Sequence, residues 1–209
     1  MKNNLFMPTD ILLPAEKPEK WAVIACDQYT SEPEYWENVR KTAGDAPSAF
    51  NIIFPEAFLG KNNAEKISKI NSVMKSYLEG GVFKEYKNTF VYTERTLKNG
   101  KTRRGIVGLI DLDNYSYEKG SKALIRATEA TVKERIPARV EIRRGAYLEM
   151  PHVMLLCDDP ENLLIGGLAS NIGNFECLYD FELMCGGGHI RGFAPDKAAA
   201  EALERHTEE

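Results

Sequence analysis

The sequence predicts an α+β fold, in which a central mixed or antiparallel sheet is flanked by helices. Apolar residues recur with a helical period over 63–79, and a hairpin signal lies at about 89–112. The other strand and helix signals are interleaved without a regular βαβ period. This irregular order favours a mixed fold over a doubly wound parallel sheet.

The first 80 residues carry one predicted strand and two predicted helices. The apolar run WAVIAC at 21–26 follows a Pro-rich, charged segment and predicts a buried strand. Ser31 is the expected N-cap of a helix, because Pro33 and acidic residues follow it. The apolar face of 63–79 predicts the second helix, which Gly80 and the next glycine terminate.

A β-hairpin is expected next. Thr89–Leu97 and Thr102–Leu112 are rich in β-branched and aromatic residues, and they flank Lys98-Asn99-Gly100-Lys101. Asn-Gly is typical of a type I′ turn, which needs positive φ at both central positions. The polar stretch 113–122 predicts a loop.

The last third combines helical and strand patterns. A helical pattern runs from Thr131 to about Tyr147, with a kink or split at Pro137. The apolar run HVMLLC at 152–157 predicts a core strand, and the Ala- and Glu-rich stretch 195–209 predicts a helix.

Length and composition set the class of protein. The 209 residues, 43% hydrophobic and 28% charged, can bury a core, so disorder is not expected. They form a single domain over 1–209, or the amino-terminal portion of a longer protein, with no internal boundary indicated. The net charge of −4 makes nucleic acid an unlikely partner. No signal peptide or membrane-spanning apolar run is present in the sequence, which predicts no membrane partner and a cytoplasmic location.

The first candidate site follows the predicted strand at 21–26. Asp27 would bind a ligand there, because loops at strand ends present functional groups on a rigid support. In the alternative interpretation, Asp27 and Thr30 only cap a turn that leads into the helix.

The second candidate site lies within 124–135, at an expected helix start. Arg126, Thr128 and Thr131 would bind phosphate or carboxylate there, and Glu129 would be the general base for a hydroxyl. In the alternative interpretation, Thr128 is an N-cap and Glu129 favours the helix dipole.

The third candidate site is the glycine-rich segment 185–192. Gly187 and Gly188 would let the backbone approach an anion, and His189 and Arg191 would contact it. A plain flexible turn is the alternative, since the Lys-Ser/Thr of a P-loop is missing.

The cysteines do not predict a metal site. Structural zinc sites favour closely spaced ligand pairs such as Cys-x-x-Cys. No such pair is formed by Cys157, Cys177 and Cys185 in the sequence, where only Cys185 and His189 are near each other. A Cys185–His189 nucleophile pair would lack an orienting partner. Reduced thiols are expected, with His152 a structural histidine beside a core strand and His206 solvated.

Three long stretches and one short motif resemble a known family. The stretches are WAVIACDQYTSEPEYW at 21–36, SKALIRATEATVKERIPAR at 121–139 and PHVMLLCDDP at 151–160, and the short motif is Gly-Gly-His-Ile at 187–190. They closely resemble the bacterial and archaeal family named domain of unknown function 1015. Its members are typically about twice as long and carry a downstream Asp-Gly-(His/Asn)-His box, which this sequence lacks. The resemblance therefore implies an amino-terminal portion.

The resemblance also implies a function. The downstream box is similar to the nucleotide-binding box of the ParB and sulfiredoxin-like fold, which includes kinases that phosphorylate free L-serine. This analogy implies a nucleotide- or phosphometabolite-binding protein, in particular a small-molecule kinase that uses ATP or ADP with Mg²⁺. A non-catalytic binding or regulatory module is the alternative, and a homo-oligomer is compatible with both.

The family's motifs match particular residues of this chain. Its Glu-x-Thr signature matches Glu129 and Thr131, and its preceding basic position matches Arg126. Asp27 matches its strand-end acid, and 187–189 match its Gly-Gly-His. In the kinase analogy, Glu129 is the base for the acceptor hydroxyl and Arg126 contacts phosphate.

Overall fold

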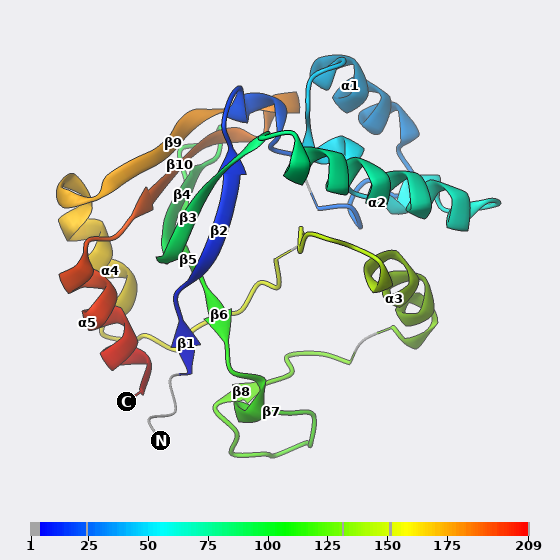
Figure 1. Cartoon of the computed structure of the whole chain (residues 1–209). Helices are drawn as coiled ribbons and strands as arrows, with labels where there is room; N and C mark the ends of the chain where they lie inside the picture. The colour runs from blue at the N-terminus through cyan, green and yellow to red at the C-terminus, as the bar shows by residue number, and fades with distance from the viewer. Residues whose placement is uncertain (1–4, 24, 131, 151, 209) are drawn as a thin grey trace.

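A four-stranded antiparallel sheet lies at the centre of the computed structural model, which describes residues 5–23, 25–130, 132–150 and 152–208 (Figure 1). The strand order is β5-β4-β10-β9. The strands are β4 (Val91–Thr96), β5 (Thr102–Val107), β9 (Glu176–Leu183) and β10 (Gly188–Ala194). With helices on its flanks, the sheet confirms the predicted α+β class.

The hairpin of β4 and β5 is confirmed, but its turn differs from the expected type. Gly100 has φ of 80°, whereas Asn99 is not among the residues with positive φ. The Leu97 amide donates to the carbonyl of Lys101 at 2.9 Å. The connection is thus a three-residue loop, which requires a left-handed conformation only at its glycine.

Two helices cover one end of one face of this sheet. They are α4 (Leu163–Asn171) and α5 (Lys197–Glu208), and they lie beside the end of β10 (Figure 1). Leu168 of α4 is buried with Tyr92 and Phe193 of the sheet. The helix predicted at 195–209 is confirmed, whereas the Gly-containing α4 was not predicted.

A second core lies on the other side of the molecule, against α2 (Asn63–Glu79), and α1 (Pro33–Ala43) lies on the same side (Figure 1). Trp21 and Met74 are buried in it. Both helices confirm the sequence prediction, and α2 has the expected bounds. The N-cap of α1 is Glu32 rather than Ser31, because Pro33 is the first helical residue.

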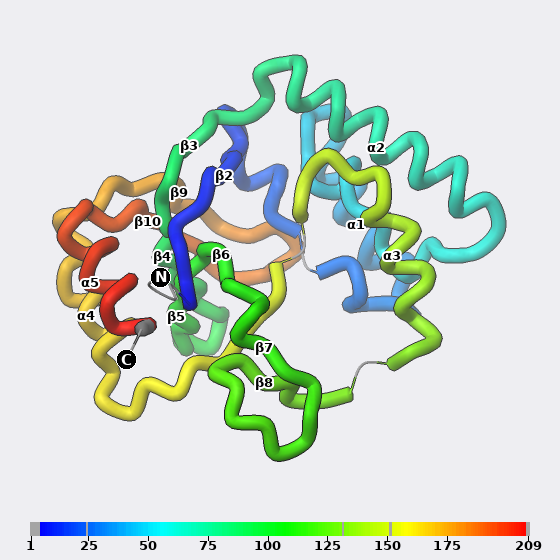
Figure 2. The backbone as a smooth tube through the Cα atoms, turned by 60° about the horizontal axis from the view of Figure 1, so that its bottom comes forward, coloured from blue at the N-terminus to red at the C-terminus, as the bar shows by residue number. Residues whose placement is uncertain are grey.

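Short strands connect these parts. Antiparallel pairs are formed by β1 (Phe6–Met7) with β6 (Leu109–Ile110), and by β2 (Thr9–Pro14) with β3 (Phe83–Thr89). Two further strands, β7 (Tyr115–Ser116) and β8 (Ile125–Arg126), pair in parallel at the opposite end of the molecule from α2 (Figures 1 and 2). The loop expected at 113–122 therefore includes β7.

The strand predicted at 21–26 is wrong for the described residues of that run, which exclude 24. Trp21 lies in a turn, and 22, 23 and 25 have no regular structure. Trp21 is 7% exposed and packs edge-on against Tyr77. An apolar run can thus be buried through its side chains without joining a sheet.

The core strand predicted at 152–157 is also wrong. No helix or strand includes these residues, and Val153 and Leu156 are 79% and 85% exposed. His152 is exposed too, so it is not the expected structural histidine. The apolar pattern predicts burial, but all six residues are exposed, and Arg103 of β5 contacts Met154 at 3.9 Å.

The exposure of Leu156 predicts a small mutational effect. Replacing Leu156 with alanine should change the free energy of unfolding by at most about 0.5 kcal/mol, because its side chain already lies in water. Urea denaturation measures this change. Replacing the buried Leu168 with alanine is the matched control and should cost more than about 2 kcal/mol. A similar loss at both positions would contradict the exposed placement.

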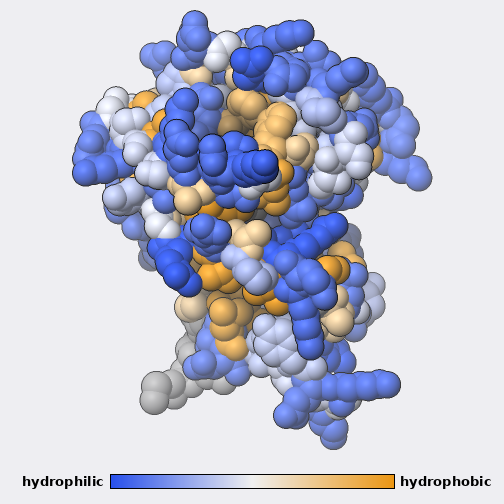
Figure 3. All heavy atoms as spheres, turned by 90° about the vertical axis from the view of Figure 1, so that its right-hand side faces the viewer, coloured by the Kyte–Doolittle hydropathy of each residue, from blue (hydrophilic) through white to orange (hydrophobic). Residues whose placement is uncertain are grey.

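Helix α3 (Ile136–Arg144) replaces the longer helix expected at 131–147. A 3-10 turn at Lys133–Arg135 precedes it, so the helical pattern is split just before Pro137, which lies in the first turn of α3. None of its residues is buried, and Ile136 and Val140 are 41% and 46% exposed. Figure 3 shows apolar side chains gathering on the face of the molecule seen from the side of α2 and α3.

Candidate functional site

One face of the central sheet carries a cluster of charged side chains around Glu94 of β4. Antiparallel register places Arg104 of β5 and Arg191 of β10 directly opposite Glu94. The Glu94 carboxylate accepts from Arg104 Nε at 3.0 Å and from Arg191 Nη2 at 2.5 Å. The Tyr92 hydroxyl donates to it at 2.9 Å. These four residues are called the sheet site.

Burial separates the carboxylate from its partners. The Glu94 side chain is 8% exposed, whereas those of Arg104 and Arg191 are 46% and 41% exposed. Burial opposes ionisation of Glu94, but hydrogen bonds from both arginines and from Tyr92 outweigh it and lower the pKa. Burial, together with the bond to Glu94, raises the pKa of Tyr92 to about 12. The sheet site is therefore an ionised, buried carboxylate that holds two solvent-facing guanidinium groups.

A second row of polar residues crosses the same sheet face. Each of its members lies two positions along its strand from Arg104, Glu94, Arg191 or Asp180. It consists of Thr102, Thr96, His189 and Glu182 and is called the polar row. The hydroxyls of Thr96 and Thr102 are 2.9 Å apart. His189 Nε2 lies 2.6 Å from the Asp180 carboxylate, which is opposite Arg191. His189 and Arg191, both predicted ligand residues, thus share this face.

The glycines at 186–188 serve the turn between β9 and β10. Gly186 and Gly188 have positive φ, and a Cβ on Gly188 would lie 2.2 Å from the Thr96 carbonyl oxygen. Arg95 donates two hydrogen bonds to the carbonyl of Gly187. These contacts agree with the turn interpretation, and the prediction that Gly187 and Gly188 bind a ligand stays untested.

Asp27 lies in a different ion-pair cluster, beneath α3. Arg139 contacts the carboxylates of Asp27 at 3.4 Å and Glu56 at 3.2 Å, and Arg135 lies 3.8 Å from Glu56. Burial, and then the charges of Asp27 and Glu56, raise the pKa of the Cys26 thiol. Among the described residues of the run 21–26 none is in a strand, so Asp27 contacts α3 from a turn rather than from a strand end.

Loss of this cluster should loosen α3. Replacing Arg139 with glutamine removes both of its ion pairs, and α3 has no buried side chain to compensate. We expect amide hydrogen exchange within 136–144 to become about 2- to 5-fold faster, the effect of about 0.5–1 kcal/mol. The control is Arg143, whose ion pair with Glu149 does not reach the Asp27 cluster. Equal exchange rates in both variants would contradict the anchoring role of Arg139.

The second candidate site is not at a helix start. Arg126 ends β8, and residues 127–130 are bends or unstructured. The next helical turn is a 3-10 turn at Lys133–Arg135, and the α-helix begins only at Ile136. Thr128 and Glu129 are exposed and make no hydrogen bond or ion pair with another described residue; Thr131 lies outside the described residues. β8 lies away from β10 in both ribbon views (Figures 1 and 2), and Glu129 makes no hydrogen bond or ion pair with a residue of the sheet site.

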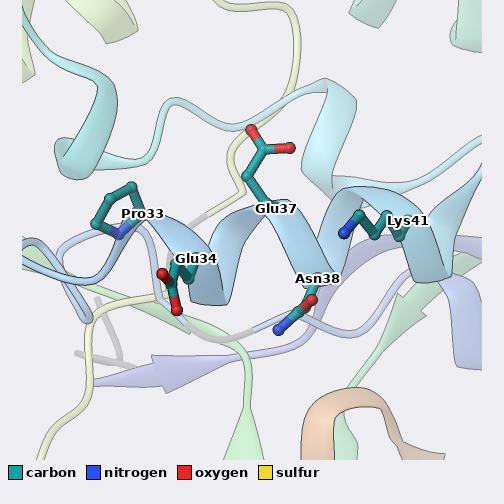
Figure 4. Close-up of a pocket in the computed structure, with 5 residues that line it drawn as sticks. All are labelled: Pro33, Glu34, Glu37, Asn38 and Lys41. Atoms are coloured by element: carbon teal, nitrogen blue, oxygen red, sulfur yellow. The ribbon is translucent and has the colours of Figure 1, made fainter.

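A hollow of about 520 Å³ lies along α1 and is lined by Pro33, Glu34, Glu37, Asn38 and Lys41. Glu37 points to one side of α1, whereas Glu34 and Asn38 point to the other, so the three do not converge on a common centre (Figure 4). Glu37 is also paired with Arg40 of the same helix. This hollow therefore lacks the converging groups of a specific site.

The cysteines are free thiols in the structure, and three of them, Cys157, Cys177 and Cys185, are exposed. Within the described ranges, no three His, Cys, Asp or Glu side chains are grouped as metal ligands would be. His206 is exposed, as expected. These residues carry no argument for chemistry.

The central residues of the sheet site were missed by sequence reasoning. Glu94 and Arg104 lie in ordinary alternating strand patterns, and Glu56 lies in an irregular segment. The predicted hairpin brings the two strands together, but a two-residue Asn-Gly turn would place Gly105 opposite Glu94. Only the observed three-residue loop places Arg104 there. The convergence of Glu94 and Arg104 on Arg191 required the pairing of β4 with β10.

Comparison with known proteins identifies the family. Within the described ranges, no helix combines the length and apolar character needed to cross a membrane. No curated protein and no solved structure matches the chain. One family model, described as protein of unknown function (DUF1015), matches residues 8–208. Because that match covers nearly the whole chain and confirms the resemblance found in its motifs, the protein belongs to the DUF1015 family.

Proposed function

We propose that this protein binds the phosphate group of a small molecule, either a phosphorylated metabolite or a nucleotide, at the sheet site. One observation carries the proposal: two half-exposed arginines on different strands are held by a single buried carboxylate. Guanidinium groups fixed in this way lose little conformational entropy when they bind an oxyanion. The hydrogen bonds to Glu94 use Nε of Arg104 and Nη2 of Arg191, which leaves other N–H groups on each half-exposed guanidinium for a ligand.

The charges around the arginines are compatible with an anion. Arg104 and Arg191 contribute two positive charges against the single negative charge of Glu94. Asp180 lies beside Arg191 but is engaged by His189. A hydrogen bond from a neutral His189 does not remove the charge of Asp180, so the four nearest charges sum to zero. An anion would therefore be held by direct contacts with the two guanidinium groups and not by a net positive charge.

Binding of inorganic phosphate tests the proposal. Isothermal titration should detect phosphate binding, and replacing Arg191 with glutamine should weaken it at least about 10-fold, the effect of losing a charge-assisted hydrogen bond. Arg103 is the matched control, because it neighbours Arg104 on β5 and points to the opposite face. The proposal fails if phosphate does not bind, or if both variants bind equally.

Phosphoryl transfer to a hydroxyl, as in a small-molecule kinase, is a second candidate function that rests on the family resemblance. Glu129 is exposed and has no described partner, as suits a base that must accept a proton. Replacing it with glutamine should abolish turnover without changing the unfolding midpoint, since no contact is lost. Unchanged turnover would remove Glu129 from the reaction.

Magnesium does not fit the sheet site. Mg²⁺ is held by carboxylate oxygens and water, but Glu94 and Asp180 are already engaged by Arg104, Arg191 and His189. We therefore derive no step through a metal ion. The lack of any contact between Glu129 and the arginines favours phosphate binding without chemistry, as in a non-catalytic regulatory module.

A further inference from the structure

We infer that the ligand of the sheet site is a phosphate ester of a short polyhydroxylated chain, that is, a sugar or polyol phosphate, and not a nucleotide recognised through its base. This inference rests on the proposed function, because it takes phosphate binding at Arg104 and Arg191 as its starting point. It comes from what lies beside the arginines on the same sheet face.

The polar row lies at the distance that a short carbon chain spans. Residues two positions apart on a strand share a face and are about 7 Å apart. Thr102 is thus one such step from Arg104, and His189 is one such step from Arg191. A phosphate at the arginines would extend its carbon chain over the polar row.

The groups of the polar row are those that recognise hydroxyls. The Thr96 and Thr102 hydroxyls bond to each other at 2.9 Å, which leaves one hydrogen and several lone pairs for a ligand. With Nε2 of His189 directed to Asp180, the other ring nitrogen is an acceptor when the ring is neutral. Adjacent strands are about 4.8 Å apart, so these groups can contact successive hydroxyls of one chain.

The same face offers no exposed aromatic ring from the sheet on which a base could stack. Tyr92 and Phe193 are its aromatic residues near the arginines, and they are 0% and 8% exposed because Leu168 of α4 covers them. Tyr179 lies on the opposite face, over Gly192. Recognition of a base usually needs such a stacking surface, so the described residues favour hydroxyl recognition.

Titration with three ligands tests the inference: inorganic phosphate, a pentose phosphate and adenosine monophosphate. The pentose phosphate should bind at least about 10-fold more tightly than inorganic phosphate, because it adds hydrogen bonds to the polar row. Adenosine monophosphate should bind no more tightly than the pentose phosphate. Replacing Thr102 with valine should weaken the pentose phosphate about 5-fold and leave inorganic phosphate unchanged.

Thr93 is the matched control, because it is a β-branched residue on the opposite face of β4, and its valine variant should bind like the wild type. Phosphate binding that depends on Arg191 without a gain from sugar hydroxyls would overturn the inference while keeping the proposed function. Tighter binding of adenosine monophosphate than of the pentose phosphate would also overturn it. If no phosphate compound binds, the proposed function itself fails.

Discussion

Replacing Glu94 with glutamine is expected to lower the free energy of unfolding by about 2–4 kcal/mol. The variant places two guanidinium groups side by side without the buried negative charge that both contact at 3.0 Å or less. The half exposure of the arginines keeps the loss below that of a fully buried ion pair. Glu182 is the control, because its exposed carboxylate lies on the same face and should tolerate glutamine.

The dependence of stability on pH provides an independent readout. The pKa of Glu94 is lowered in the folded state from its ordinary value of 4.5, so ionised Glu94 favours folding. Its contribution is complete above that ordinary value and is lost as the pH falls through the folded pKa. Denaturation midpoints of the wild type should therefore fall more steeply in acid than those of the glutamine variant. Parallel acid limbs would contradict the role given to Glu94.

Replacing Gly188 with alanine is expected to cost at least about 3 kcal/mol or to prevent folding. The residue has φ of 90°, and the new Cβ would lie 2.2 Å from the carbonyl oxygen of Thr96. That atom belongs to the backbone of β4 and cannot move away without breaking the β4–β10 pairing. Chemical denaturation of purified protein measures the effect.

Gly167 of α4 is a control with the opposite expected sign. It is helical and exposed, and a Cβ there would meet no atom within 4 Å. Alanine at this position should stabilise the protein by about 0.5–1 kcal/mol. A soluble Gly188→Ala protein with a wild-type unfolding midpoint would show that the close approach of β10 to β4 is not required.

Elements defined by local signals were predicted with the correct type. The period of α2, its terminal glycine and the β4–β5 hairpin depend on residues that are close in the sequence, although the hairpin turn is a three-residue loop and not the expected type I′. The strands predicted at 21–26 and 152–157 were wrong because an apolar run indicates only that its residues tend to be buried. It does not indicate which strand would pair with them. Trp21 satisfies that tendency against helix α2, and Val153 does not satisfy it among the described residues.

The residues of the candidate site show the same difference between local sequence signals and tertiary pairing. Arg191 and His189 were found because they follow a glycine turn, whereas Glu94 and Arg104 follow no motif. The grouping of Arg126 and Glu129 with an anion-binding helix start failed because the helix begins later, at Ile136. Sequence spacing therefore identified one strand of the sheet site and missed the other two.

By itself, the sequence determined the α+β class, the helices α1, α2 and α5, one hairpin and the family, since each depends on local periodicity, turn chemistry or long motifs. Only the tertiary structure decided that Glu94, Arg104 and Arg191 share one face of a sheet. The physical reason is register: an antiparallel pairing between β4 and β10, nearly a hundred positions apart in the chain, selects which charges become neighbours.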